Sequence, residues 1–149
     1  MERRQKRILT DFAVVLIITA AAIAAIINFK DYVNKSEAMQ AMKQLSQIIL
    51  KYKKQTGAVP PEAYIDDIME NIEGKVRLGR LYYRARWIDF GVKPDTILAY
   101  VKKEYPSSIL PDGYIVLRLD GTVEWMEPGK SEELLAEQQT PFELELLKK

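Results

Sequence analysis

Residues 12 to 29 read Phe-Ala-Val-Val-Leu-Ile-Ile-Thr-Ala-Ala-Ala-Ile-Ala-Ala-Ile-Ile-Asn-Phe, an uncharged run that is the strongest structural signal in the chain. As an α-helix, about 18 residues span roughly 27 Å, close to the hydrocarbon thickness of a bilayer. A soluble helix of this composition would be apolar on every side, and a chain this short has little else to cover it. We therefore expect a transmembrane helix over residues 12–29.

Basic residues gather on one side of this run. Residues 1–11 contain Arg3, Arg4, Lys6 and Arg7, whereas Lys30 and Asp31 nearly cancel on the far side. The positive-inside rule then keeps the basic flank cytoplasmic. We expect a single-pass protein of the cell inner membrane, with its N-terminus cytoplasmic and its C-terminal domain extracytoplasmic.

A cleavable signal peptide is the main alternative to a retained anchor. A basic start, an apolar run and the small residues Ala20-Ala21-Ala22 satisfy its outline. The apolar run continues past this site through Ile23, Ile26 and Ile27, where a signal peptide normally turns polar. The retained anchor is therefore favoured.

Small residues repeat at a spacing of four inside the run, Ala20 with Ala24 and Ala21 with Ala25. Such a stripe lets membrane helices approach closely, although alanine is also simply a good helix former. Asp11 has two interpretations as well: it caps the start of the helix, or it pairs with a neighbouring subunit in the membrane. These five residues are the candidate packing residues of the membrane helix.

The composition limits the available chemistry. The 149 residues include no cysteine and no histidine, which excludes disulfides, thiolate metal sites and histidine-based catalysis. The 22 basic and 21 acidic residues nearly balance, so nucleic acid is not the expected partner. Turns and a helix account for the remaining candidate carboxylates, which are Asp66, Asp67, Asp112 and Asp120. We expect no catalysis, no cofactor and no metal.

An amphipathic pattern follows the anchor. Apolar residues recur at three- and four-residue spacing, at Ala38, Ala41, Met42, Leu45, Ile48, Ile49 and Tyr52. No proline or glycine occurs from Asp11 to Thr56, so residues 30–57 are predicted to continue the anchor as one long helix. Gly57 ends this helix, and Pro60-Pro61 prevents its resumption.

An α+β domain is predicted over residues 58–128, a small antiparallel sheet with short helices packed on the long helix. It begins with a helix over 61–71. A strand with a basic outer face is expected next, because Leu81, Tyr83, Ala85 and Trp87 alternate with Arg80, Tyr82, Arg84 and Arg86. Pro94 is then predicted to start a helix that reaches about Tyr105.

A hairpin is predicted over residues 114–126, around Asp120-Gly121. A two-residue loop would mix polar and apolar side chains on both faces. A three-residue loop with Gly121 left-handed instead leaves Arg118, Thr122 and Glu124 on the outer face. This register pairs Leu117 with Val123 and Ile115 with Trp125.

The acidic C-terminal segment, residues 129–149, gives a divided signal. Leu134-Leu135 favours a helix, while Phe142-Glu-Leu-Glu-Leu146 alternates like a strand. Periodicity alone leaves both structures open.

The whole organisation resembles the type IV pilin and pseudopilin family. A long N-terminal helix runs into Tyr52, Gly57 and Pro60, and Asp120-Gly-Thr-Val-Glu-Trp125 is similar to a hairpin motif of some bacterial pilin-like proteins. The resemblance implies a non-catalytic subunit of a filament or secretion complex, with copies of itself or related pilin-like subunits as partners. Pilin precursors carry a glycine before their processing site, whereas the stretch from Arg7 to Asp11 contains none.

One further function is a hypothesis from the residues alone. Arg80, Tyr82, Arg84 and Arg86 would place guanidinium groups beside an aromatic ring on one strand face. Such a face could hold phosphates or stack on bases, which would make the chain a membrane-anchored module for polyanions. A solvated strand face is the simpler interpretation of the same pattern.

Overall fold

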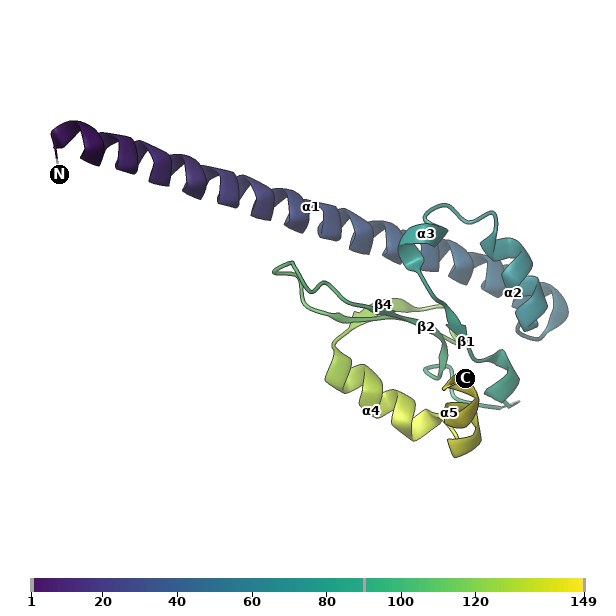
Figure 1. The fold of residues 1–149 in the computed structure, drawn as a ribbon. Coiled ribbons are helices and arrows are strands. Elements are labelled where there is room, and N and C mark those ends of the chain that lie inside the picture. Colours follow the sequence, from purple (N-terminus) through teal and green to yellow (C-terminus); the bar gives the residue numbers. More distant parts are fainter. Residues whose placement is uncertain (1, 90, 149) are drawn as a thin grey trace.

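A long helix dominates the computed structural model, which describes residues 2–89 and 91–148 (Figure 1). This helix, α1, runs unbroken over Arg3–Thr56, a length of 54 residues. It ends at Gly57, whose φ of 78° is left-handed and whose N–H donates to the Lys53 carbonyl. Glycine adopts this conformation without a steric penalty. The prediction of one continuous helix ending at Gly57 is confirmed.

One four-stranded antiparallel sheet follows, in the order β1-β2-β3-β4. The strands are β1 (Tyr82–Tyr83), β2 (Ile97–Lys103), β3 (Gly113–Arg118) and β4 (Val123–Met126). Together with the helices this gives the α+β fold predicted from the sequence.

Strands β3 and β4 form the predicted hairpin. Leu117 pairs with Val123 and Ile115 with Trp125, and Gly121 has a φ of 91°. Both the register and the three-residue loop are therefore confirmed.

Helices cover both faces of the sheet (Figure 1). The second half of α1 packs on one face, where its buried side chains meet Ile115 and Leu117 of β3. Helix α4 (Pro128–Gln138) packs on the other face, where Leu135 meets Tyr114 and Val116. Successive side chains of β3 thus enter two different cores, which explains why the strand is buried almost throughout.

Short helices complete the fold. Helix α2 (Glu62–Met69) confirms the helix predicted over 61–71, and α2 and α3 (Lys75–Leu78) lie beside the second half of α1 (Figure 1). The C-terminal segment is helical in both parts, as α4 and α5 (Pro141–Leu147). Each has proline in its first turn, where the missing N–H costs no helical hydrogen bond.

The helix predicted from Pro94 to about Tyr105 is wrong. Pro94 instead lies in a turn in which Thr96 N donates to Lys93 O, and the chain continues as β2. Residues 97 to 101 are all buried because β2 lies between α1 and α4, so the strand carries a continuous apolar run without alternation. An irregularity between Ile97 and Ala99 further disturbs the two-residue period.

The strand predicted over residues 80–87 is also largely wrong. Only Tyr82–Tyr83 pair with β2, and Ala85–Trp87 form a short 3₁₀ helix, η1. The Arg84 N–H still donates to Leu98 O of β2, and the chain then turns into η1. The Arg84 side chain is buried, against a partner described below.

Candidate functional site

The first half of α1 is an exposed apolar surface. Ile17 is 69% exposed, and the 18-residue window of highest hydropathy in this helix averages 2.6 and has none of its residues buried. Figure 1 shows this half extending away from the rest of the described chain. The helix is long and apolar enough to cross a membrane.

The candidate packing residues all lie on this exposed half. Ala20, Ala21, Ala24 and Ala25 are exposed along the helix. Asp11 lies well inside α1, because the helix starts at Arg3. The interpretation of Asp11 as a helix cap is therefore wrong, and its interpretation as a pairing group stays a prediction.

The two halves of α1 meet at Asn28. Its side-chain amide donates to the Ala24 carbonyl at 2.8 Å. Its side-chain oxygen accepts two hydrogen bonds from the loop between β2 and β3, one from Ser108 Oγ and one from Ile109 N, both at 2.7 Å. The loop is thus held against the helix at the end of its apolar run.

Further contacts join the second half of α1 to the sheet. The Lys35 ammonium lies 3.7 Å from the ring centre of Trp125, a cation–π contact, and burial lowers the Lys35 pKa. Ser46 Oγ donates to Gly121 O at 2.6 Å and so links the helix to the hairpin turn. These contacts fix the direction of the exposed half relative to the domain.

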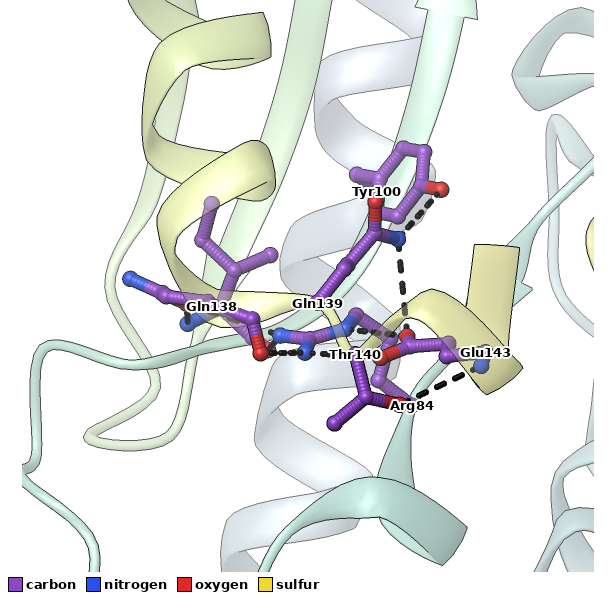
Figure 2. Close-up of polar contacts among 7 residues, drawn as sticks. Arg84, Tyr100, Gln138, Gln139, Thr140 and Glu143 are labelled. Carbon is purple, nitrogen blue, oxygen red and sulfur yellow. Dashed lines mark hydrogen bonds and ion pairs between the residues drawn. The ribbon is translucent and has the colours of Figure 1, made fainter. Parts of the chain in front are cut away.

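A buried ion pair lies on the opposite side of the sheet (Figure 2). Arg84 and Glu143 have side chains only 3% and 1% exposed. Arg84 Nε donates to Glu143 Oε1 at 2.7 Å, and Nη2 donates to Oε2 at 3.2 Å. This two-point pairing suits the planar guanidinium and a carboxylate.

Neutral groups complete this network. Arg84 also donates to the carbonyls of Ile97 and Gln138, at 2.6 and 3.0 Å. Gln139 donates to Tyr100 Oη at 3.1 Å, and Thr140 Oγ1 accepts from Glu143 N at 3.2 Å. Figure 2 shows these side chains gathered at the corner between α4 and α5. The network joins this corner to β2, which is the role of a structural pair and not of an exposed binding group.

The structure divides the predicted basic face. Arg84 is buried, whereas Arg86 is exposed and pairs with Glu62 at 3.4 Å. The Arg80 guanidinium lies 4.9 Å from the ring centre of Tyr82. The expectation that Arg84 lies on an outer face is wrong, and polyanion binding by the other three residues stays a prediction.

The sequence interpretation missed Glu143. A signal for its position was present, because Thr140-Pro141-Phe142-Glu143 is a helix-start pattern with a capping threonine, a proline in the first turn and a glutamate three residues after the cap. No local pattern links Glu143 to Arg84, which lies 59 residues earlier.

The candidate carboxylates have local structural roles or are exposed. Asp112 Oδ1 accepts from Tyr105 N at 2.6 Å, and Asp120 Oδ1 accepts from Thr122 N at 2.9 Å. Asp66 and Asp67 are exposed on α2. Within residues 2–89 and 91–148, no cluster of three or more acidic side chains has the geometry of a metal site.

Comparison with protein-family models, with curated proteins and with solved structures found no match to this chain.

Proposed function

We propose that this chain is a single-pass membrane-anchored structural subunit of a bacterial envelope assembly, similar in organisation to pilins and pseudopilins. The observation that carries the proposal is the exposed apolar half of α1, of which the 18-residue window has no buried residue. Water contact with so large an apolar surface is unfavourable by about 25 cal/mol per Å², and a bilayer removes it. The anchor then holds the domain at the membrane surface.

The alanine stripe supplies a surface for assembly. Ala20 lies eighteen residues, or about five turns, before Ala38, so the two point to the same side of α1. Ala38 is fully buried against the domain. A neighbouring helix on Ala20 and Ala24 would therefore lie in the bilayer beneath the domain, with small side chains allowing a close approach.

Asp11 faces away from Ala20 and Ala24 and lies within about 40° of Ala25, which follows it by fourteen residues, or nearly four turns. It precedes Ala20 by nine residues, or about two and a half turns. A head-to-tail contact between the Ala20 and Ala24 side of one copy and the Asp11 side of the next would leave each copy with one free side. Such a contact builds rings or filaments, whereas a two-fold contact closes as a dimer.

The first experiment is the mass of the protein recovered from membranes. An intact N-terminus supports a retained anchor, and the lack of a glycine before Ile8 or Leu9 argues against pilin-type processing. Loss of the segment up to Ala22 or Ala25 would instead indicate secretion. Loss of the residues before Ile8 or Leu9 would indicate pilin-type processing.

The second experiment uses the lack of native cysteine to test the stripe by cross-linking in the membrane. Ala24→Cys lies on the stripe, and Ile26→Cys is its matched control on the far side, 68% exposed in the monomer. In a two-fold pair, we expect Ala24→Cys to cross-link to a second Ala24→Cys copy. In a head-to-tail contact, we expect it to cross-link to co-expressed Ile26→Cys. Cross-linking only between Ile26→Cys copies contradicts the role of the stripe. A protein that cross-links at neither position and is monomeric in mild detergent contradicts assembly.

A further inference from the structure

The loop between β2 and β3 has the composition and position of a membrane-contacting element. Residues 105 to 111 read Tyr-Pro-Ser-Ser-Ile-Leu-Pro, an uncharged stretch between Glu104 and Asp112. Ile109, near its centre, is 88% exposed, compared with 69% for Ile17 and Phe29 of the apolar run. Single exposed aliphatic side chains are common on protein surfaces, and Val76 is 85% exposed, so the position of Ile109 beside the anchor is what gives its exposure meaning.

The loop lies at the level where the apolar run of α1 ends. Asn28, which binds both Ser108 and Ile109, is the next-to-last residue of the run. A helical rise of 1.5 Å per residue puts Asn28 about 1.5 Å from Phe29 along the axis. Figure 1 shows the loop turning back along α1 toward the N-terminal half. The exposed side chain of Ile109 is therefore near the predicted boundary of the hydrocarbon.

The backbone of the loop is suited to contact with lipid. The N–H groups of Tyr105, Ser108, Ile109 and Leu110 all donate within the protein, to Asp112, Tyr105, Asn28 and Ser108 respectively. Pro106 and Pro111 have no N–H to satisfy. Bonded or absent donors at these six of the seven loop positions lower the cost of moving the loop out of water.

Polar and aromatic groups complete the boundary. A hollow of about 340 Å³ lies between α1 and the loop, lined by Ile27, Lys30, Asp31, Glu104, Tyr105, Pro106 and Ser107. Apolar side chains and charges of both signs meet there, as they do at the headgroup level of a bilayer. Tyr32, which is 64% exposed just after the anchor, adds an aromatic group of the type enriched at this level.

We infer that residues 106–111 form a second membrane contact, in which Ile109 enters the bilayer at the boundary between headgroups and acyl chains. This inference rests on the proposed anchor and adds a second point of attachment. The subunit would then contact the bilayer through one helix that crosses it and one loop on its surface. The contacts of Asn28, Lys35 and Ser46 already fix the domain on α1, so the loop contact sets the tilt of the whole subunit on the membrane, and every subunit presents the alanine stripe at one inclination. Lys30 stands next to Asp31 in sequence, and Glu104 pairs with Lys102 at 2.7 Å, so the charges around the loop nearly balance and the contact needs no anionic lipid.

The test places an environment-sensitive fluorophore on single cysteines of the full-length chain in phosphatidylcholine vesicles. Ile109→Cys reports the loop and Ile17→Cys reports the anchor. Val76→Cys is the matched control, because it is 85% exposed and apolar but lies on α3. Gly74, at the start of α3, approaches Glu37 and Ala41, which puts this control roughly 14–20 Å beyond Asn28 along α1.

The expected pattern has three parts. Lipids with a nitroxide near the headgroup quench Ile109→Cys several-fold more than Val76→Cys, and lipids with a mid-chain nitroxide quench Ile17→Cys most. Added salt changes none of these ratios. The further substitution Asn28→Ala removes the side-chain tether and lowers quenching at Ile109→Cys without lowering it at Ile17→Cys.

Each other outcome overturns a distinct claim. Quenching at Ile17→Cys with none at Ile109→Cys above the Val76→Cys control overturns the loop contact and leaves the anchor standing. No quenching at Ile17→Cys overturns the anchor and the loop contact with it. A loop signal that arises from self-quenching between labelled copies, and disappears when the vesicles are diluted in lipid, assigns Ile109 to a second copy and overturns the lipid contact.

Discussion

Ile17 is 69% exposed and Leu45 is fully buried, although both are large aliphatic residues of the same unbroken helix. The first half of α1 has apolar residues on all sides, and within residues 2–89 and 91–148 nothing buries its most apolar 18-residue window. The second half has them on the side that meets Ile115 and Leu117, with polar residues elsewhere. Helical structure is common to both halves, and the distribution of apolar side chains around the helix axis decides what each half contacts.

The largest expected loss of stability comes from a substitution at the corner between α4 and α5. Arg84 of the buried ion pair there donates to β2 and α4, so it tests the domain independently of either half of α1. Arg84→Met leaves Glu143 buried without its counter-charge and is expected to destabilise the domain by about 3–5 kcal/mol. The measurement is denaturant unfolding of the full-length chain in mild detergent, followed by tryptophan fluorescence. Trp87 is a suitable reporter because its ring centre lies 5.7 Å from the ring centre of Phe142 in α5.

The matched control removes both charges. Arg84→Met with Glu143→Leu replaces the pair by apolar groups of similar size, and we expect it to recover most of the lost stability. A single Arg84→Met variant as stable as the parent would contradict a buried, fully paired network.

Leu45→Ala tests the buried half of α1. Removing this side chain leaves a cavity between the helix and the sheet, with an expected loss of about 2–5 kcal/mol in the free energy of unfolding. Ile17→Ala, its counterpart in the exposed half, should change unfolding of the domain by less than about 0.5 kcal/mol. Equal effects of the two substitutions would mean that the first half also packs on the domain.

Ile17→Arg tests whether the exposed half of α1 is the membrane anchor, because it places a charge in the apolar run. A charge at the centre of a membrane helix costs about 2.5–3.5 kcal/mol in insertion experiments, so we expect a several-fold smaller fraction of protein in washed membranes. Gln47→Arg is the control, since Gln47 is exposed in the second half. If both variants remain in the membrane fraction to the same extent, the apolar run is not the anchor.

The sequence predicted those parts of the fold that depend on neighbouring residues. The length of α1 followed from the lack of proline and glycine, and the register of the hairpin followed from sorting Arg118 and Glu124 onto one face. These two side chains indeed form an ion pair at 2.6 Å. In each case the deciding residues lie within a few positions of one another.

The errors occurred where distant segments decide the structure. Strand β2 is covered by α1 on one face and α4 on the other, so its side chains do not alternate between apolar and polar. Arg84 seemed to belong to an exposed face because Glu143, its partner, comes from another part of the chain. The contact of Asn28 with Ile109 likewise joins residues far apart in sequence, and no local pattern predicts it.

The smallest expected effect concerns the turn that Ser46 of α1 contacts. The N–H of Thr122 donates to the Asp120 carboxylate and lowers its pKa below the usual value. A lowered pKa in the folded state adds stability above the pKa of the unfolded chain, and this contribution is lost as pH falls through the folded value. For an exposed carboxylate the contribution is at most about 1 kcal/mol.

Asp120→Asn should therefore reduce stability slightly at neutral pH and approach the parent below about pH 4, near the ordinary pKa of aspartate. The measurement is the free energy of unfolding as a function of pH, with Asp66→Asn on exposed α2 as the control. If the free energies of unfolding of the parent and of Asp120→Asn differ by the same amount at neutral and acidic pH, ionisation of Asp120 does not stabilise the turn. The hydrogen bond from Ser46 to Gly121 would then hold the turn on α1 without help from the carboxylate.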